Sequence, residues 1–135
     1  ANTLFMEINQ SDNPAKIQEY FGQLYKDLSV HAEAEEQVVY PAVRAFYNDT
    51  QELYDEQAEM KVLLNQIKAM SPASAEFKSK VNQLKDIVMD HVRQEESTMF
   101  TAIRNNLSSA QSEQLATQFK AAKSKLQDKM SAAMK

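Results

Sequence analysis

His31-Ala-Glu-Ala-Glu35-Glu36 recurs sixty residues further along the chain as His91-Val-Arg-Gln-Glu95-Glu96. Both copies read H-x-x-x-E-E, and these are the only two histidines in the sequence. Each copy continues with an aromatic residue, an alanine followed by an aliphatic residue, and an arginine. Because the motif is repeated together with its flanks, it is stronger evidence for a functional site than a single His–Glu pair at this spacing. The matching flanks are Tyr40, Ala42, Val43 and Arg44 in the first copy and Phe100, Ala102, Ile103 and Arg104 in the second.

Both copies lie on long stretches whose apolar residues recur every three or four positions, the spacing of one face of a helix. We predict long helices over 14–47 and 75–105 and further helices over about 1–9, 50–70 and 110–133. No stretch alternates with a period of two, so the predicted fold class is all-α. The predicted inward faces are Ile17, Phe21, Leu24, Leu28, His31, Glu35, Val38, Ala42 and Ala45 in the first long helix, and Phe77, Val81, Leu84, Val88, His91, Glu95, Thr98 and Ala102 in the second.

Polar and proline-containing segments separate the predicted helices. Ser11-Asp12-Asn13-Pro14 offers an N-cap followed by a proline at an early helical position. Pro41 lies late in the first long helix and has no N–H, so we expect a kink near Gln37 or a helix end soon after. The predicted inward face of the last helix is Leu115, Phe119, Ala122, Leu126 and Met130.

Length and composition indicate one domain spanning 1–135, with a core of ordinary size for a single domain. The chain has no cysteine, which excludes disulfides, iron–sulfur clusters and thiolate catalysis and is typical of a cytoplasmic protein. The net charge is −4 and the charges are interspersed, so no nucleic-acid partner is expected. No apolar run reaches the length of a membrane span, so no membrane association is expected either.

The inward faces are apolar except at His31, Glu35, His91 and Glu95. Residues four apart share one face of a helix, so each His and its Glu point into the bundle together. If the two long helices run antiparallel, the motifs meet at mid-bundle. Burying imidazoles and carboxylates is costly unless they are paired or bound to a cation, and this donor set suits iron, manganese or zinc. The alternative is that each pair is a hydrogen-bonded structural pair. Tyr40 and Phe100 are predicted to pack in the core rather than to act in redox chemistry.

At these residues the sequence resembles the hemerythrin-like, or HHE cation-binding, family. The similarity rests on Leu28-Ser-Val-His31-Ala-Glu-Ala-Glu35-Glu36, on Val39-Tyr40-Pro41-Ala42-Val43, and on the His91 motif followed by Met99-Phe100. It implies an up-down four-helix bundle around two non-heme iron ions joined by an oxo or hydroxo bridge. It also implies that the glutamates of the two motifs bridge the irons and that histidines complete each coordination sphere. The first helix would be shortened, and the last helix would be an addition.

Two departures from the family pattern affect the expected ligands. The family places a His on its first helix shortly before an apolar pair resembling Leu4-Phe5, and this chain begins just after that position. We therefore expect the parent protein to continue N-terminally with that His. On the third helix the family His aligns with Gln57, a poor iron ligand; Glu56 is the best substitute, with Tyr54 and Glu59 weaker. The expected metal ligands are His31, Glu35, His91, Glu95 and Glu56.

The resemblance implies a protein that binds or senses dioxygen, or a related small ligand, at its metal centre. A second hypothesis is an enzyme that processes peroxide or nitric oxide at the same centre, although no dedicated catalytic residue is evident. A third is a structural or interaction bundle that has lost its metal. A shortened first helix exposes part of the core, and two hypotheses cover this patch: a swapped homodimer in which a partner's helix fills the gap, or the last helix of the same chain filling it.

Overall fold

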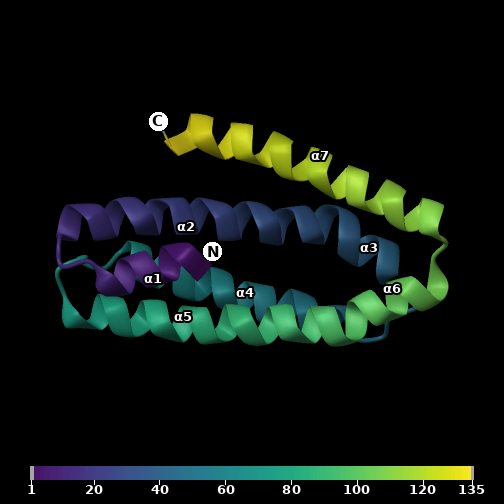
Figure 1. Ribbon diagram of the computed structural model, residues 1–135, viewed down its shortest axis with the longest axis horizontal. Helices are drawn as coiled ribbons and strands as arrows, with labels where there is room; N and C mark the ends of the chain where they lie inside the picture. The colour runs from purple at the N-terminus through teal and green to yellow at the C-terminus, as the bar shows by residue number, and fades with distance from the viewer. Residues whose placement is uncertain (1, 135) are drawn as a thin grey trace.

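The computed structural model describes residues 2–134, with side chains for residues 3–131, as a bundle of helices (Figure 1). The described residues contain no strand, which confirms the all-α prediction. No described helix combines the length and apolarity that crossing a membrane requires. The helices are α1 (Asn2–Gln10), α2 (Pro14–Ala34), α3 (Tyr40–Val43), α4 (Thr50–Lys68), α5 (Ala75–Gln94), α6 (Phe100–Asn106) and α7 (Ser109–Met134), with π-helical turns at Glu35–Val39 and Glu95–Met99.

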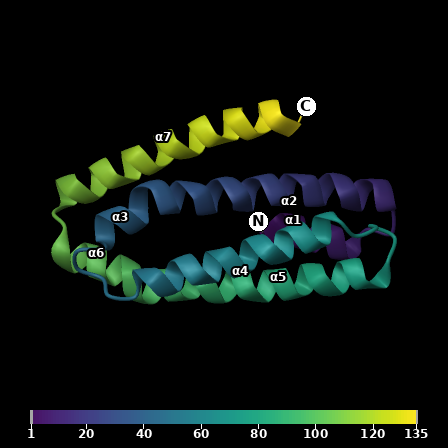
Figure 2. The same ribbon diagram turned by 180° about the vertical axis from the view of Figure 1, so that it is seen from behind.

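Two long arms of the bundle run in the same direction. The first arm comprises α2, the π turn after it and α3 (residues 14–43), and the second comprises α5, its π turn and α6 (residues 75–106). Figures 1 and 2 show α2 and α5 pointing the same way and α4 returning in the opposite sense. The antiparallel arrangement considered for the two motifs is therefore wrong, since helices two apart in an up-down bundle are parallel. His31 lies 17 residues after the start of α2 at residue 14, and His91 lies 16 after the start of α5 at residue 75. Parallel helices that start together bring the motifs to the same height.

The short first helix and the last helix pack on different sides of α2. α1 packs against α2 and α5 within the bundle. α7 runs back along the outer face of α2 and the π-helical turn that follows it (Figure 1). Leu115 of α7 is buried, and Phe119, Ala122, Leu126 and Met130 are half-buried, so the predicted inward face of this helix is confirmed.

Two apolar clusters lie one after the other along the bundle. The larger joins α1, α2, α4 and α5, and the smaller joins α3, the start of α4 and the second arm. The segments between the clusters carry the H-x-x-x-E motifs. The larger cluster includes Phe5, Ile8, Phe21, Leu24, Leu64, Ile67, Phe77 and Leu84, and the smaller consists of Val39, Tyr40, Val43, Tyr47, Leu53 and Met99.

Each long arm changes from α-helix to a π-helical turn at the glutamate of its motif. A π turn holds one residue more than an α turn, so it moves every later residue on by one position. Val39 is buried where Val38 was expected, and Met99 where Thr98 was expected. The inward positions predicted at Val38, Ala42, Ala45 and Thr98 are therefore wrong by one residue, whereas Ala102 packs against the smaller cluster as predicted.

Proline is not the common cause of the two π turns. The first arm ends at Val43, two residues after Pro41 and before the expected Tyr47, in accord with the predicted helix end. The second arm has the same π turn with Thr101 at the matching position. The predicted start of the first arm is confirmed, because the Asn13 side chain accepts a hydrogen bond from the Ala15 N–H at 3.0 Å and Pro14 follows the cap.

Candidate metal centre

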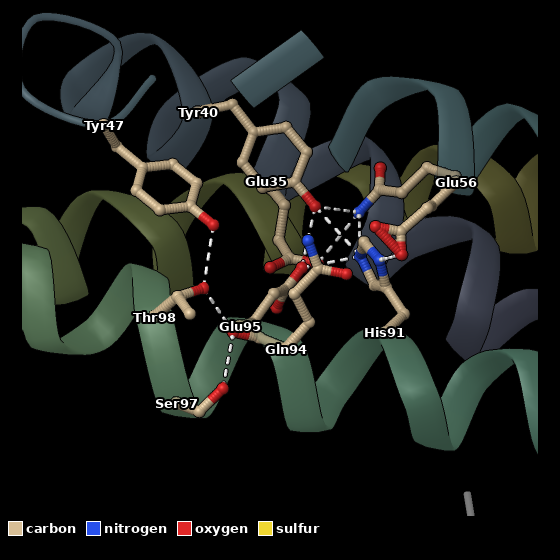
Figure 3. Close-up of polar contacts among 10 residues, drawn as sticks. Glu35, Tyr40, Tyr47, Glu56, His91, Gln94, Glu95, Ser97 and Thr98 are labelled. Carbon is tan, nitrogen blue, oxygen red and sulfur yellow. Dashed lines mark hydrogen bonds and ion pairs between the residues drawn. The ribbon is translucent and has the colours of Figure 1, made fainter. Parts of the chain in front are cut away.

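The two H-x-x-x-E motifs meet between the apolar clusters, and Figure 3 shows Glu35 of the first motif beside His91 and Glu95 of the second. Glu35, Glu95 and His91 are 3%, 3% and 7% exposed, whereas the His31 side chain is 45% exposed. Burial of this kind is unusual for glutamates unless each finds a partner. The structure thus brings together the four motif residues that the sequence singled out.

One half of this cluster lies on the first arm. His31 Nε2 is 3.2 Å from Glu35 Oε1, the contact expected of residues four apart on a helix. One donor atom from each of His31, Glu35 and Glu95 lies within 4.8 Å of the others. Glu95 therefore reaches across from the second arm to the His31–Glu35 pair.

The other half of the cluster is centred on His91. Its Nε2 is 2.6 Å from Glu95 Oε1, and the Tyr40 hydroxyl donates a hydrogen bond to the same oxygen at 2.7 Å. The Tyr40 hydroxyl is also 3.1 Å from His91 Nε2. Core packing was predicted for Tyr40, and its ring is indeed fully buried, but its hydroxyl ends inside the polar cluster. Core packing is wrong for Phe100, which is 41% exposed.

Gln57 of α4 fills the remaining side of the cluster. It is 1% exposed, and its Nε2 donates hydrogen bonds to Glu35 Oε1 at 3.0 Å and to the Tyr40 hydroxyl at 2.6 Å. Its Oε1 has no hydrogen-bond partner among the described residues. Gln57, which aligns with the family histidine, is therefore the α4 residue buried in the cluster.

Glu56, the expected substitute ligand, lies behind His91 rather than beside Nε2. Its Oε2 is 3.5 Å from Nδ1, the ring nitrogen on the other side from the Glu95 contact, too long for a full hydrogen bond. The neighbouring Gln94 amide, with its nitrogen turned toward Glu56, donates to the carboxylate at 2.8 and 3.0 Å. Tyr54 reaches only the Glu36 carbonyl at 3.5 Å, and Glu59 is exposed. The ligand role of Glu56 stays a prediction.

Ionising both Glu35 and Glu95 in this buried cluster would cost free energy, because two neighbouring negative charges would lose their contact with water. Burial raises the pKa of Glu35 strongly, and the neighbouring Glu95 raises it further. Burial also acts to raise the pKa of Glu95, but hydrogen bonds from His91, Glu35 and Tyr40 outweigh it and lower that pKa. The carboxylates thus share a proton, as two close carboxyl groups generally do.

The two histidines respond to their surroundings in opposite ways. Burial lowers the pKa of His31 and outweighs the attraction of Glu95. Burial acts on His91 in the same direction, but the hydrogen bond and charge of Glu95 outweigh it and raise the pKa of His91. At neutral pH His31 therefore presents a neutral imidazole, the form that coordinates a metal.

The donor chemistry of this cluster fits a metal cation. Two imidazoles and two carboxylates converge, and one carboxylate must hold a proton when nothing else neutralises the pair. A cation would replace that proton. The unpartnered Oε1 of buried Gln57 would likewise gain an electropositive neighbour. These features favour a metal site over a self-contained network of hydrogen bonds.

A cavity of about 410 Å³ opens onto the cluster. The exposed edge of His31 packs edge-on against Phe119 of α7, with ring centroids 5.4 Å apart, and Lys123 Nζ lies 5.6 Å from the Phe119 centroid. The helix that packs outside the bundle thus forms the rim of the cavity. The lining residues are Asp27, Leu28, His31, Ala32 and Glu35 on the first arm, Gln57 and Met60 on α4, Val88, His91, Val92 and Glu95 on the second arm, and Lys123 and Gln127 on α7.

Comparisons with known proteins agree with the geometry. The family described as hemerythrin HHE cation binding domain matches residues 2–103, which leaves α7 outside the match. A protein named DNA nickase from Nostoc sp. (strain PCC 7120 / SAG 25.82 / UTEX 2576) is 71% identical over 131 residues, covering 96% of this chain and 37% of that protein. This chain therefore corresponds to little more than a third of that relative's length. No solved structure matches significantly.

Proposed function

Because the chain belongs to the hemerythrin HHE cation-binding family, we propose that its His/Glu cluster holds two iron ions and that the adjoining cavity admits dioxygen or a related small ligand. The observation that carries this proposal is the sharing of Glu95 between two groups of donors. One group is His31 with Glu35, whose donor atoms lie within 4.8 Å of a Glu95 oxygen, and the other is His91, whose Nε2 is 2.6 Å from Glu95 Oε1. A carboxylate placed in this way is suited to bridge two ions in a helical bundle.

The residues of the chain have separate tasks in this function. His31 and His91 would supply ring-nitrogen donors, His91 after losing its proton, and Glu35 and Glu95 would supply the negative charge that offsets the cations. Bound iron supplies redox capacity and exchangeable coordination positions. The cavity gives a small molecule access from the His31 side, while Phe119 and Lys123 of α7 restrict the opening.

The first experiment is iron reconstitution followed by exposure to dioxygen. Ferrous protein prepared without oxygen should develop a visible spectrum when dioxygen is admitted, and this spectrum should fade on its removal. His91→Ala should abolish the response, whereas Glu36→Gln, one residue from the cluster, should retain it. A wild-type chain that binds iron but shows no dioxygen response refutes dioxygen binding. Sustained consumption of peroxide would instead support the enzymatic alternative.

DNA strand nicking is a second candidate, favoured by the name of the 71% identical relative. It would reverse the expectation that no nucleic acid is bound. The charge distribution supports it: residues 2–103 carry nine Lys or Arg against seventeen Asp or Glu, whereas α7 carries four Lys against two acidic residues. Lys123 places one of these positive charges at the rim of the cavity, where a phosphate would approach a metal ion.

Plasmid relaxation tests this second candidate. The metal-loaded chain should convert supercoiled plasmid to the open circular form, and chelator or His91→Ala should prevent it. Lys123→Gln should slow nicking, while the matched α7 change Lys125→Gln, at an exposed position that does not line the cavity, should have less effect. No nicking with iron, manganese or magnesium would refute this second candidate for residues 1–135.

A further inference from the structure

We infer that Tyr40 is a metal ligand, completing the half of the centre formed by His91 and Glu95. This inference rests on the proposed iron centre and adds a residue that the motif alone does not identify. Tyr40 lies at the Nε2 side of His91, whereas Glu56, the substitute ligand expected from the sequence, lies at the Nδ1 side.

The three donor atoms form a compact triangle. His91 Nε2 and Glu95 Oε1 are 2.6 Å apart, Tyr40 Oη and Glu95 Oε1 are 2.7 Å apart, and Tyr40 Oη and His91 Nε2 are 3.1 Å apart (Figure 3). In an octahedral shell with bonds of about 2.1 Å, neighbouring donors lie about 3 Å apart. The three atoms therefore have the spacing of one face of such a shell, and a single ion can contact all of them.

Among the residues that the structure describes, no other nearby phenol has this position. Tyr54 packs its ring edge-on against Tyr40, with centroids 5.1 Å apart, but its hydroxyl is directed to the Glu36 carbonyl. The Tyr47 hydroxyl is 2.8 Å from that of Thr98. In the second copy of the repeat the matching residue is Phe100, which is exposed and has no hydroxyl. The repeat thus offers one phenol, on one side of the centre.

Phenolate oxygen is an established iron ligand in proteins. Without metal the phenol keeps its proton and donates it to Glu95 in a hydrogen bond. Coordination would replace both this proton and the proton that His91 Nε2 holds toward the same Glu95 oxygen, and both protons would leave to solvent, as protons do when metals bind. The freed Glu95 oxygen would then be available to the ion, and Gln57 Nε2, 2.6 Å from the hydroxyl oxygen, would continue to donate to the phenolate. The tyrosine, the histidine and the carboxylate bind as one unit.

Visible spectroscopy of the ferric protein tests the inference. Wild-type protein loaded with ferric iron should show a phenolate-to-iron charge-transfer band, with tyrosinate ring vibrations in resonance Raman spectra excited in that band. Tyr40→Phe should abolish the band and weaken iron binding by about tenfold or more. Tyr54→Phe, which removes the hydroxyl of the adjacent ring, and Tyr47→Phe should keep it.

The outcomes separate this inference from the proposed function. Iron bound by the wild type without any phenolate band overturns the role of Tyr40 and leaves the iron centre standing. Absence of bound iron overturns both. If Tyr40→Phe loses its helical circular dichroism, the other two variants decide: a band that disappears in Tyr54→Phe or Tyr47→Phe refutes the assignment, and a band that survives in both supports it.

Discussion

Replacing Glu35 by Gln should stabilise the metal-free protein while destroying its response to metal. Burial and the nearby Glu95 raise the pKa of Glu35 from 4.5 to about 10, so the folded chain holds a proton that the unfolded chain releases. Since pH 7 lies about 2.5 units above the unfolded pKa of 4.5, holding this proton lowers the free energy of unfolding by at most about 3 kcal/mol. Gln has the same shape and needs no proton. The variant should therefore gain about 1–3 kcal/mol in free energy of unfolding at pH 7.

The sign of this effect fixes its pH dependence. Between pH 4.5 and about 10 the folded state binds more protons at Glu35 than the unfolded state does, so wild-type stability falls as pH rises. In Glu35→Gln this contribution is absent. The two proteins should have similar stability near pH 5 and diverge steadily toward pH 9. Urea unfolding of chelator-treated protein, followed by circular dichroism at several pH values, measures the divergence.

A matched control is the neighbouring Glu36→Gln. Glu36 lies outside the cluster and pairs with Lys61 at 2.7 Å, so its loss should cost less than about 1 kcal/mol and leave the pH slope unchanged. Metal should stabilise wild type and Glu36→Gln, by about 2.7 kcal/mol at a hundredfold excess over Kd. It should not stabilise Glu35→Gln. A wild-type slope that persists in Glu35→Gln would refute the shared-proton account of the carboxylate pair.

Three further substitutions probe other parts of the site. His91→Ala should remove bound metal altogether, and unchanged stoichiometry in elemental analysis would contradict its role. Glu56→Ala should weaken metal binding about 10–100-fold if the carboxylate orients the His91 ring, which equilibrium titration can measure, whereas loss of one metal equivalent would make Glu56 a ligand instead. Phe119→Ala should uncover His31 and speed removal of metal by a chelator, and an unchanged rate would show that α7 does not limit access.

Much of this fold is visible in the sequence because two patterns coincide. The three-and-four spacing of apolar residues predicts the helices, and the repeated H-x-x-x-E motif marks where both inward faces turn polar. His31, Glu35, His91 and Glu95 consequently lie together in the structure. They meet because α2 and α5 run parallel and the two histidines lie at nearly the same distance, 17 and 16 residues, from the starts of these helices.

The rest depends on local geometry that helical periodicity does not contain. The π turns at Glu35 and Glu95 add a residue, so Val39 and Met99 take the buried places predicted for Val38 and Thr98. A simple period of 3.6 cannot anticipate such an insertion. The hydroxyl of Tyr40 was missed for a related reason. A sequence pattern that predicts a buried aromatic residue indicates core packing and says nothing about its hydroxyl. The one available signal for a polar role is that the repeat has tyrosine in one copy and phenylalanine in the other.

Metal content per chain is the most direct test of the central claim. Protein purified without chelator, or reconstituted with ferrous iron and desalted, should contain about two iron ions per chain by elemental analysis, held by the cluster around Glu95. His91→Ala measured alongside should contain far less. A folded wild-type chain that retains no iron, manganese or zinc would contradict the metal centre and leave a helical scaffold whose buried carboxylates share a proton.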